Sequence, residues 1–280
     1  MQLHFDGTLR WWQLAGCLFV PLALWVRLAW VATRSQRWRA SHLPHHALQS
    51  EDALPPILLQ SLPSCRRRDA AILAAHAFCD SPAYAHILRG DKAFRLEALV
   101  WLFERNISLV QQASARADPT RCLPSPSGRL LCFFWLLPST TTISLLAKVR
   151  QGLLWFPLLF GLGAFCRLLT VGDMFDKATA SIVRHHILSE ADRHAVLVLE
   201  RMVVDPLLQG RGVGSACLRS ALSACAQNPV VLSTQLPRNV EFYSRLGFVV
   251  VHEELIGADN DEHRFRSWWM LRPAATTSIS

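Results

Sequence analysis

The chain has 280 residues, of which 51% are hydrophobic and 18% are charged, and its formal net charge is +8. This length supports one large domain or two ordinary ones, with a sizeable core in either case. A mean hydropathy of +0.21 excludes a disordered chain, a collagen-like chain and a coiled coil. The composition fits either a globular protein with a very apolar core or a globular domain that also touches a membrane.

The positive charge is concentrated near the N-terminus. Residues 1–68 contain eight arginines and three acids, which gives this segment +5 and leaves +3 for the rest of the chain. Because that larger part has no basic stripe interleaved with aromatic residues, we predict no nucleic-acid partner. The eight cysteines form no C-x-x-C pair and lack metal-ligand spacing. We therefore predict buried thiols in a reducing, intracellular compartment, and no metal site.

The first uncharged block covers residues 11–26, between Arg10 and Arg27. This run is shorter than the roughly 20 residues that span a bilayer, although it reaches that length if it continues to Thr33. We favour a membrane anchor with lipid contact through residues 11–33. An organelle transit peptide and a plain apolar helix are the alternatives.

A proline-containing linker follows this apolar block. We divide the chain into an apolar, Arg-rich leader with its linker (1–61), a folded domain (62–273) and a short tail (274–280). Helical spacing predicts helices over 69–79 and 91–112, the second capped by Asp91.

A polar loop is expected at 113–128, followed by a buried strand over 129–137 that Pro138 ends. The second uncharged block, residues 151–166, is interrupted by a proline and two glycines. We favour a buried helix pair that covers a sheet, with a membrane-facing insertion as the alternative.

The signals are strongest from residue 194 onwards. Apolar runs predict strands at 195–204, 230–234, 248–252 and 264–271, and helical spacing predicts helices at 213–226 and 239–246. Gly247 is placed to end the second of these helices. This order of strands and helices indicates an α/β fold with a mixed sheet.

Residues 203–214 connect a strand to a helix through a glycine-rich turn. Such a turn directs backbone N–H groups towards an anion at the positive end of the helix dipole, and glycines let the backbone approach it. A Rossmann fingerprint would need a glycine where Ser215 stands, and a P-loop would need a lysine. A turn without a ligand is the remaining alternative to a pyrophosphate site.

Three motifs together resemble the GNAT superfamily of acyl-CoA-dependent N-acetyltransferases. They are Val204-x-Pro-x-x-Gln-Gly-x-Gly-x-Gly214, then Asn239-Val-x-Phe-Tyr-x-x-x-Gly-Phe248, and finally Trp269-Met-x-Arg272. The pattern in which His194 opens the expected strand resembles the branch of the family that contains puromycin N-acetyltransferase. The resemblance implies a GNAT-like mixed twisted sheet flanked by helices.

The same resemblance implies roles for individual residues. Met202, Val203 and Val204 would line the pantetheine arm of acetyl-CoA, and Asn239 would lie beside it. The pyrophosphate would be held by residues 210–215. The cofactor-binding loop is Gln209, Gly210, Arg211, Gly212, Val213, Gly214 and Ser215.

Tyr243 would be the general acid that protonates the leaving thiolate, with a core aromatic residue as the alternative. Relatives often have a Glu before Thr234 and an Asn where Leu236 stands, so the general base is not given by the motif. His194 and Glu200 are the candidate bases. For each, a purely structural role is the alternative.

The resemblance implies transfer of an acetyl group from acetyl-CoA to a primary amine on a small molecule or peptide, by direct attack in a ternary complex. The alternative is a catalytically degenerate domain that senses acyl-CoA or serves as a membrane-associated scaffold. Five acids between residues 253 and 262 lie in an expected loop. We hypothesise that they attract a cationic amine, and a solvated loop is the alternative.

Overall fold

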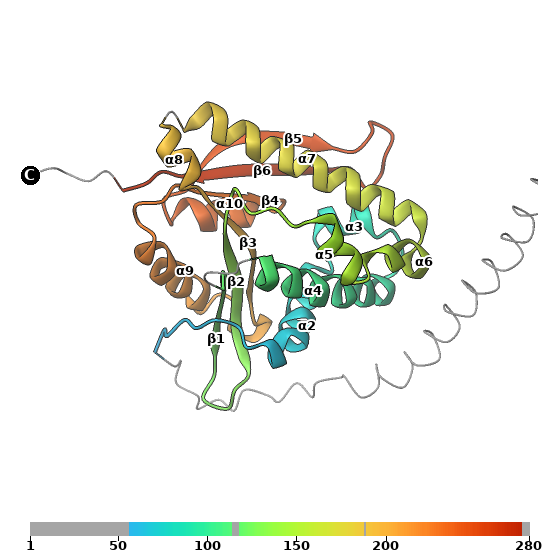
Figure 1. Cartoon of the computed structure of the whole chain (residues 1–280), viewed down its shortest axis with the longest axis horizontal. Coiled ribbons are helices and arrows are strands. Elements are labelled where there is room, and N and C mark those ends of the chain that lie inside the picture. Colours follow the sequence, from blue (N-terminus) through green and yellow to red (C-terminus); the bar gives the residue numbers. More distant parts are fainter. Residues whose placement is uncertain (1–55, 114–117, 188, 276–280) are drawn as a thin grey trace, which may run out of the picture.

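A computed structural model describes residues 56–113, 118–187 and 189–275. Its centre is one six-stranded sheet with the order β1-β2-β3-β4-β6-β5 (Figure 1). Neighbouring strands are antiparallel except for β3 and β4, which run parallel. The mixed sheet predicted from the sequence is confirmed. The strands are β1 (Thr120–Pro124), β2 (Leu130–Pro138), β3 (Leu197–Val204), β4 (Val230–Thr234), β5 (Val249–Ile256) and β6 (Phe265–Arg272).

Helices cover both faces of this sheet. One face packs against α2 (Arg67–Phe78), α3 (Pro82–Ile87), α4 (Lys92–Ala113), α6 (Phe156–Phe160) and α7 (Leu162–His186). The opposite face packs against α9 (Val213–Ala224) and α10 (Pro237–Ser244). The remaining elements are η1 (Ser64–Arg66), α5 (Leu145–Arg150), η2 (Leu153–Trp155), α8 (Glu190–His194) and η3 (Pro206–Leu208).

The two faces of the sheet have separate apolar cores. Phe133, Trp135 and Trp269 belong to the core beneath α2, α4 and α7. Phe134 and Leu232 belong to the core beneath α9 and α10. Adjacent residues of β2 enter different cores because successive strand side chains point to opposite faces.

The C-terminal elements follow the sequence prediction closely, whereas four features differ. The expected polar loop at 113–128 contains β1, and a helix continues from residue 162 to 186 as α7. His194 ends the short helix α8 and does not open the strand. Strand β5 continues to Ile256, so that Glu253 and Glu254 lie on a strand and not in a loop.

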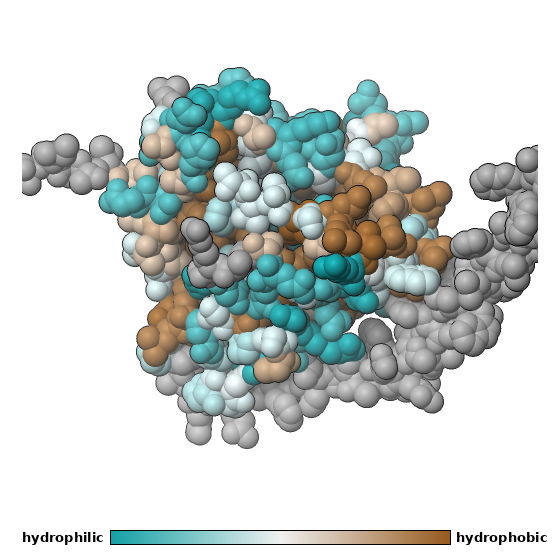
Figure 2. All heavy atoms as spheres, viewed as in Figure 1, coloured by the Kyte–Doolittle hydropathy of each residue, from teal (hydrophilic) through white to brown (hydrophobic). Residues whose placement is uncertain are grey.

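The block at 151–166 is helical and only its inner side is buried. Phe156 and Phe160 pack in the core against Trp101, whereas Leu154, Trp155 and six further large hydrophobic residues between 145 and 169 are exposed. Figure 2 shows this apolar surface over α5 and α6. The predicted helix pair is therefore present, but it buries one side only. Lipid contact by its outer side stays a prediction.

The predicted leader lies almost entirely outside the described residues, so residues 11–33 and their membrane contact stay predictions. Within the described part, no helix has both the length and the hydropathy needed to cross a bilayer. The folded domain begins before the expected boundary at 62, since the backbone of Gln60 forms hydrogen bonds with the backbone of Cys122 in β1. Four of the seven described cysteines are buried, and all seven are free thiols.

Candidate active site

The candidate site begins where β3 and β4 separate. These parallel strands pair only at Leu197–Val230 and Val198–Val231, although both continue beyond those residues. Past the last pair, their backbones no longer bond to each other, and a wedge opens between their carboxyl ends. An extended ligand can bond there to backbone groups that the neighbouring strand leaves free.

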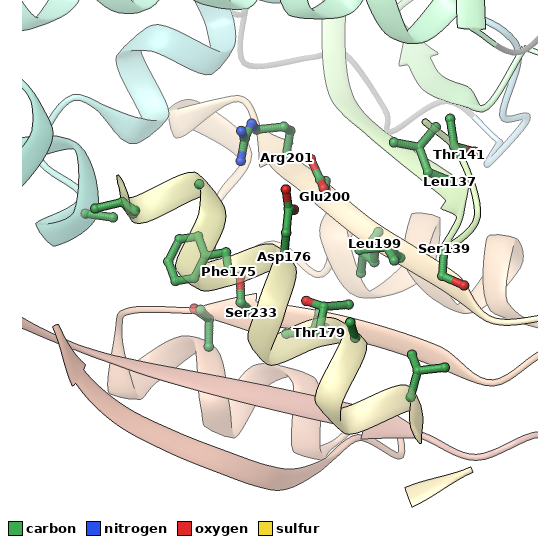
Figure 3. A pocket seen from close by; sticks show the side chains of 18 of the residues that line it. Leu137, Ser139, Thr141, Phe175, Asp176, Thr179, Leu199, Glu200, Arg201 and Ser233 are labelled. Carbon is green, nitrogen blue, oxygen red and sulfur yellow. The ribbon is translucent and has the colours of Figure 1, made fainter. Parts of the chain in front are cut away.

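A cavity of about 890 Å³ lies against this wedge. Its walls come from β3, β4, α3, α7, α10 and the segment after β2 (Figure 3). Several predicted site residues line it together, although they are far apart in the sequence: His194, Glu200, Met202, Asn239 and Tyr243. Val203, Val204 and the loop 209–215 are not among its lining residues.

A β-bulge in β3 sets the direction of the central side chains. Opposite β2, Glu200 pairs with Trp135 and Val203 pairs with Phe133, so two residues of β3 face one of β2. Arg201, in the bulge, has φ of 54°. The extra residue interrupts the alternation of the strand and brings Glu200 and Arg201 to the same side of the sheet. Both side chains lie near Trp135.

Glu200 is half-buried at the opening of the wedge, two residues beyond the last β3–β4 pair. The indole Nε1 of Trp135 donates a hydrogen bond of 3.2 Å to its Oε2. This bond fixes one carboxylate oxygen and leaves the other available to accept a proton. Glu200 therefore has both the position and the free lone pairs of a general base.

His194 is exposed at the edge of the same cavity. It precedes the β3–β4 pairs, so it lies at the closed end of the wedge, whereas Glu200 lies at the open end. Of the two candidate bases, Glu200 has the better position relative to a ligand in the wedge.

Tyr243 reaches the cavity from α10, on the other side of the wedge. Its ring is buried and packs edge-on against Phe242 and Phe248, at centroid distances of 5.0 and 5.7 Å. Burial raises the pKa of the Tyr243 phenol above its ordinary value, because the charged phenolate is poorly solvated there. Its burial and ring contacts also fit the alternative of a core aromatic residue, so the general-acid role of Tyr243 stays a prediction.

Asn239 connects the start of α10 to the end of β4. Its Nδ2 donates to Thr234 Oγ1 at 3.1 Å. Ser233 stands where relatives often carry a Glu, and its exposed side chain lines the cavity. The wall formed by β4 thus supplies hydroxyl groups and no carboxylate.

The glycine-rich turn leads into α9 with its backbone open to solvent. Gly210 and Gly212 have φ of 77° and 81°, and a Cβ on either would meet no atom within 4 Å. The left-handed φ explains the glycines, because other residues adopt it at a cost. Gly210, Arg211 and Gly212 are exposed just before the positive end of this 12-residue helix, where the pyrophosphate is predicted to bind.

The third glycine has a different role. A Cβ on Gly214 would lie 2.9 Å from Val204 Cγ2, so this glycine lets α9 pack closely on β3. Asp205, at the start of the turn, is buried. Its carboxylate accepts a hydrogen bond from the Leu207 N–H and forms an ion pair with Arg129, and these contacts stabilise the turn. This packing fixes the start of α9 relative to the wedge.

The sequence analysis missed four charged residues that line the cavity: Asp176, Arg184, Arg193 and Arg201. Asp176 comes from α7 and points towards β3 in Figure 3. Burial, together with the Glu200 carboxylate, raises the pKa of Asp176. Arg201 follows Glu200, and two successive charges inside the apolar run AVLVLERMVV were a signal that could have identified it. Asp176 had no such signal, because α7 was not predicted over this region.

The acids at 253–262 do not line the cavity. They pair locally: Glu253 with Arg266 at 2.7 Å, and Asp261 with Arg89 and His86. The hypothesis that this segment attracts the acceptor is therefore not supported, because neighbouring basic groups offset its charge. Among the described residues, no group of three or more His, Cys, Asp or Glu side chains is arranged to hold a metal ion.

Comparisons with known proteins agree with this geometry. Residues 176–250 match a family model described as an acetyltransferase (GNAT) domain. A solved structure titled histone acetyltransferase HPA2 and related acetyltransferase, from Corynebacterium glutamicum, has a TM-score of 0.51 and 18% identity. The match covers 79% of this chain and 98% of that one.

Two further solved structures have lower scores. A polyamine N-acetyltransferase from Drosophila melanogaster has a TM-score of 0.48 and 14% identity, with 76% and 98% of the two chains covered. A phosphinothricin acetyltransferase from Sinorhizobium meliloti, in complex with AcCoA, has 0.46 and 10%, with 80% and 91% covered. A search of curated proteins found no match.

The family match covers residues 176–250, and the similarity in fold covers most of the chain. The resemblance seen in the motifs is confirmed over residues 176–250, and the fold class that it implied is confirmed as well. The narrower similarity to the puromycin N-acetyltransferase branch stays a prediction.

Proposed function

We propose that this protein transfers an acetyl group from acetyl-CoA to a primary amine by direct attack in a ternary complex. The observation that carries the proposal is the convergence of Glu200 and Tyr243 on one cavity, at the point where β3 and β4 separate. The family match supports acetyl-CoA as the donor. The pantetheine arm would lie along Met202, Val203 and Val204, with the pyrophosphate at the start of α9.

The proposed reaction uses one proton acceptor and one proton donor. Glu200 removes a proton from the bound ammonium, and the free amine attacks the thioester carbonyl carbon. The new C–N bond forms, the C–S bond breaks, and its electron pair goes to sulfur. Tyr243 donates its proton to that sulfur, so the products are an amide and CoA thiol.

The acceptor wall of the cavity supports a cationic substrate. Asp176 and Glu200 place two carboxylates near each other, which favours an ammonium group between them. A small-molecule amine or a peptide amine both satisfy this requirement. Membrane contact through residues 11–33 and organelle targeting are separate predictions on which this reaction does not depend.

The test is acetyl transfer by the full chain to a panel of polyamines, amino acids and peptide N-termini, with products measured by mass. We expect acetylated amine and CoA in equal amounts. Binding of acetyl-CoA without any acetylated product would instead support the acyl-CoA sensor. Glu200→Gln should lower kcat strongly, whereas His194→Gln should change it little. The reverse order would make His194 the base.

A further inference from the structure

Arg201 has an environment that the proposed reaction does not explain. It is the only non-glycine residue with positive φ in the described part of the chain. Such a backbone conformation is strained and persists where the surrounding structure enforces it, often at ligand sites. The bulge that creates this φ places the Arg201 side chain on the cavity side of the sheet.

Three aromatic rings hold the guanidinium in place. Its Cζ lies 5.8, 5.5 and 5.8 Å from the ring centroids of Tyr84, Phe103 and Trp135. These rings restrict the side chain and replace part of its water shell. Aromatic contacts of this kind stabilise a cation, but they do not occupy its N–H donors.

Those donors lack an acceptor within the described residues. The Nε atom is buried without a hydrogen-bond partner, and no hydrogen bond or ion pair joins the guanidinium to a carboxylate. Arg129, by contrast, has such a partner in Asp205. Of the other arginines that line the cavity, Arg193 donates to the backbone carbonyls of Ile187 and Arg184, and Arg184 itself is exposed. A half-buried, oriented and unpaired guanidinium is suited to a carboxylate, which its planar donors bind in a bidentate manner.

The position of Arg201 places its guanidinium N–H groups in the cavity where the acceptor substrate is proposed to bind. Glu200 is its neighbour in the chain, and both side chains line the cavity together with Asp176. One cavity therefore presents carboxylates for an ammonium group and a guanidinium for an anion. We propose that Arg201 binds a carboxylate of the acceptor, so that the substrate class is a small amino-carboxylic acid. This inference rests on the proposed acetyl transfer to an amine.

The test compares ω-amino carboxylic acids of increasing chain length with their own carboxamides, which keep the amine and lose the charge. We expect kcat/KM of the full chain to be about ten- to a hundredfold higher for the acid of the preferred length. Arg201→Met should bring this ratio close to one, and Arg201→Lys should leave an intermediate ratio. Aminoalkyl phosphonates are assayed beside the carboxylic acids. A higher kcat/KM for the phosphonates would show a preference for phosphate-like anions and would overturn the assignment of a carboxylate.

Arg105→Met is the matched control. Arg105 also lies over an aromatic ring, 3.7 Å from Trp101, but it does not line the cavity. This variant should keep the wild-type ratio of acid to amide. Equal kcat/KM for acid and amide in the wild type would overturn the proposal, as would a ratio that Arg201→Met leaves unchanged.

A binding measurement separates this inference from the proposed reaction. The full chain is saturated with CoA, and each amino acid or amide is titrated into it in a calorimeter. This titration measures the Kd of each compound without requiring turnover. If no amine is acetylated but the acid binds more tightly than the amide, acetyl transfer fails and the carboxylate site stands. If amines are acetylated without preference for the acid, the carboxylate site fails alone. If Arg201→Met does not fold, the wild-type and Arg201→Lys ratios decide.

Discussion

Tyr243 is the residue whose substitution separates chemistry from binding. Tyr243→Phe keeps the ring in its contacts with Phe242 and Phe248 and removes only the hydroxyl. We expect kcat to fall by about 10²- to 10⁴-fold, the usual contribution of a general acid, while the Kd for acetyl-CoA changes little. Steady-state kinetics and equilibrium binding measure the two quantities. An unchanged kcat would remove Tyr243 from the mechanism.

Asp176 has a pKa raised by burial and by Glu200, and this has a consequence for stability. The native state then holds the Asp176 proton more tightly than the unfolded state, so ionisation of Asp176 costs stability as pH rises through its unfolded and then its native pKa. Asp176→Asn should therefore be more stable than the wild type at pH 7. The difference should disappear below the ordinary pKa of Asp, about 3.9. Urea unfolding at both pH values measures it.

The same substitution should weaken acceptor binding. Without the Asp176 charge, we expect KM for a cationic amine to rise more than kcat falls. Asp173→Asn is the matched control, since Asp173 lies on the same helix but pairs with Lys177 at 2.7 Å and does not line the cavity. Equal KM values for Asp176→Asn and the wild type would remove Asp176 from the acceptor site.

At the scale of elements, the contact between α9 and β3 determines where the predicted cofactor loop lies. Gly214→Ala places a Cβ 2.9 Å from Val204 Cγ2, and we expect a loss of about 1–3 kcal/mol in the free energy of unfolding. Gly172→Ala on α7 is the control, because its Cβ would meet nothing within 4 Å. It should stabilise the protein by up to about 1 kcal/mol. Chemical denaturation that ranks Gly214→Ala as the more stable variant would contradict this packing.

Local signals predicted some elements and not others. Gly210, Gly212 and Gly247 mark the start of α9 and the end of α10 because they meet backbone requirements that are local to the chain. Strand β1 contains Pro124 and follows a polar segment, and it forms through pairing with β2. The bulge at Arg201 likewise depends on register with β2, so alternation along β3 did not predict that Glu200 and Arg201 share a face.

Across the whole molecule, the net charge of the chain does not describe the charged groups of the proposed acceptor cavity. The chain carries +8, with more than half of it in residues 1–68, whereas the proposed acceptor cavity is lined by two carboxylates and three guanidinium groups. The sequence predicted a cofactor loop and three catalytic candidates, Tyr243, His194 and Glu200. Sequence patterns could not predict the proposed acceptor wall, because α3, α7 and β3 meet only in the folded chain.

Transfer of the acetyl group itself tests the central claim most directly. The full chain, in excess over acetyl-CoA labelled in its acetyl group, is mixed with an amino-carboxylic acid or with buffer and quenched after a single turnover. We expect the label to move to the amine only when the amine is present, with none attached to the protein. Label that stays on acetyl-CoA despite bound amines, or that appears on the protein, would contradict direct transfer in a ternary complex.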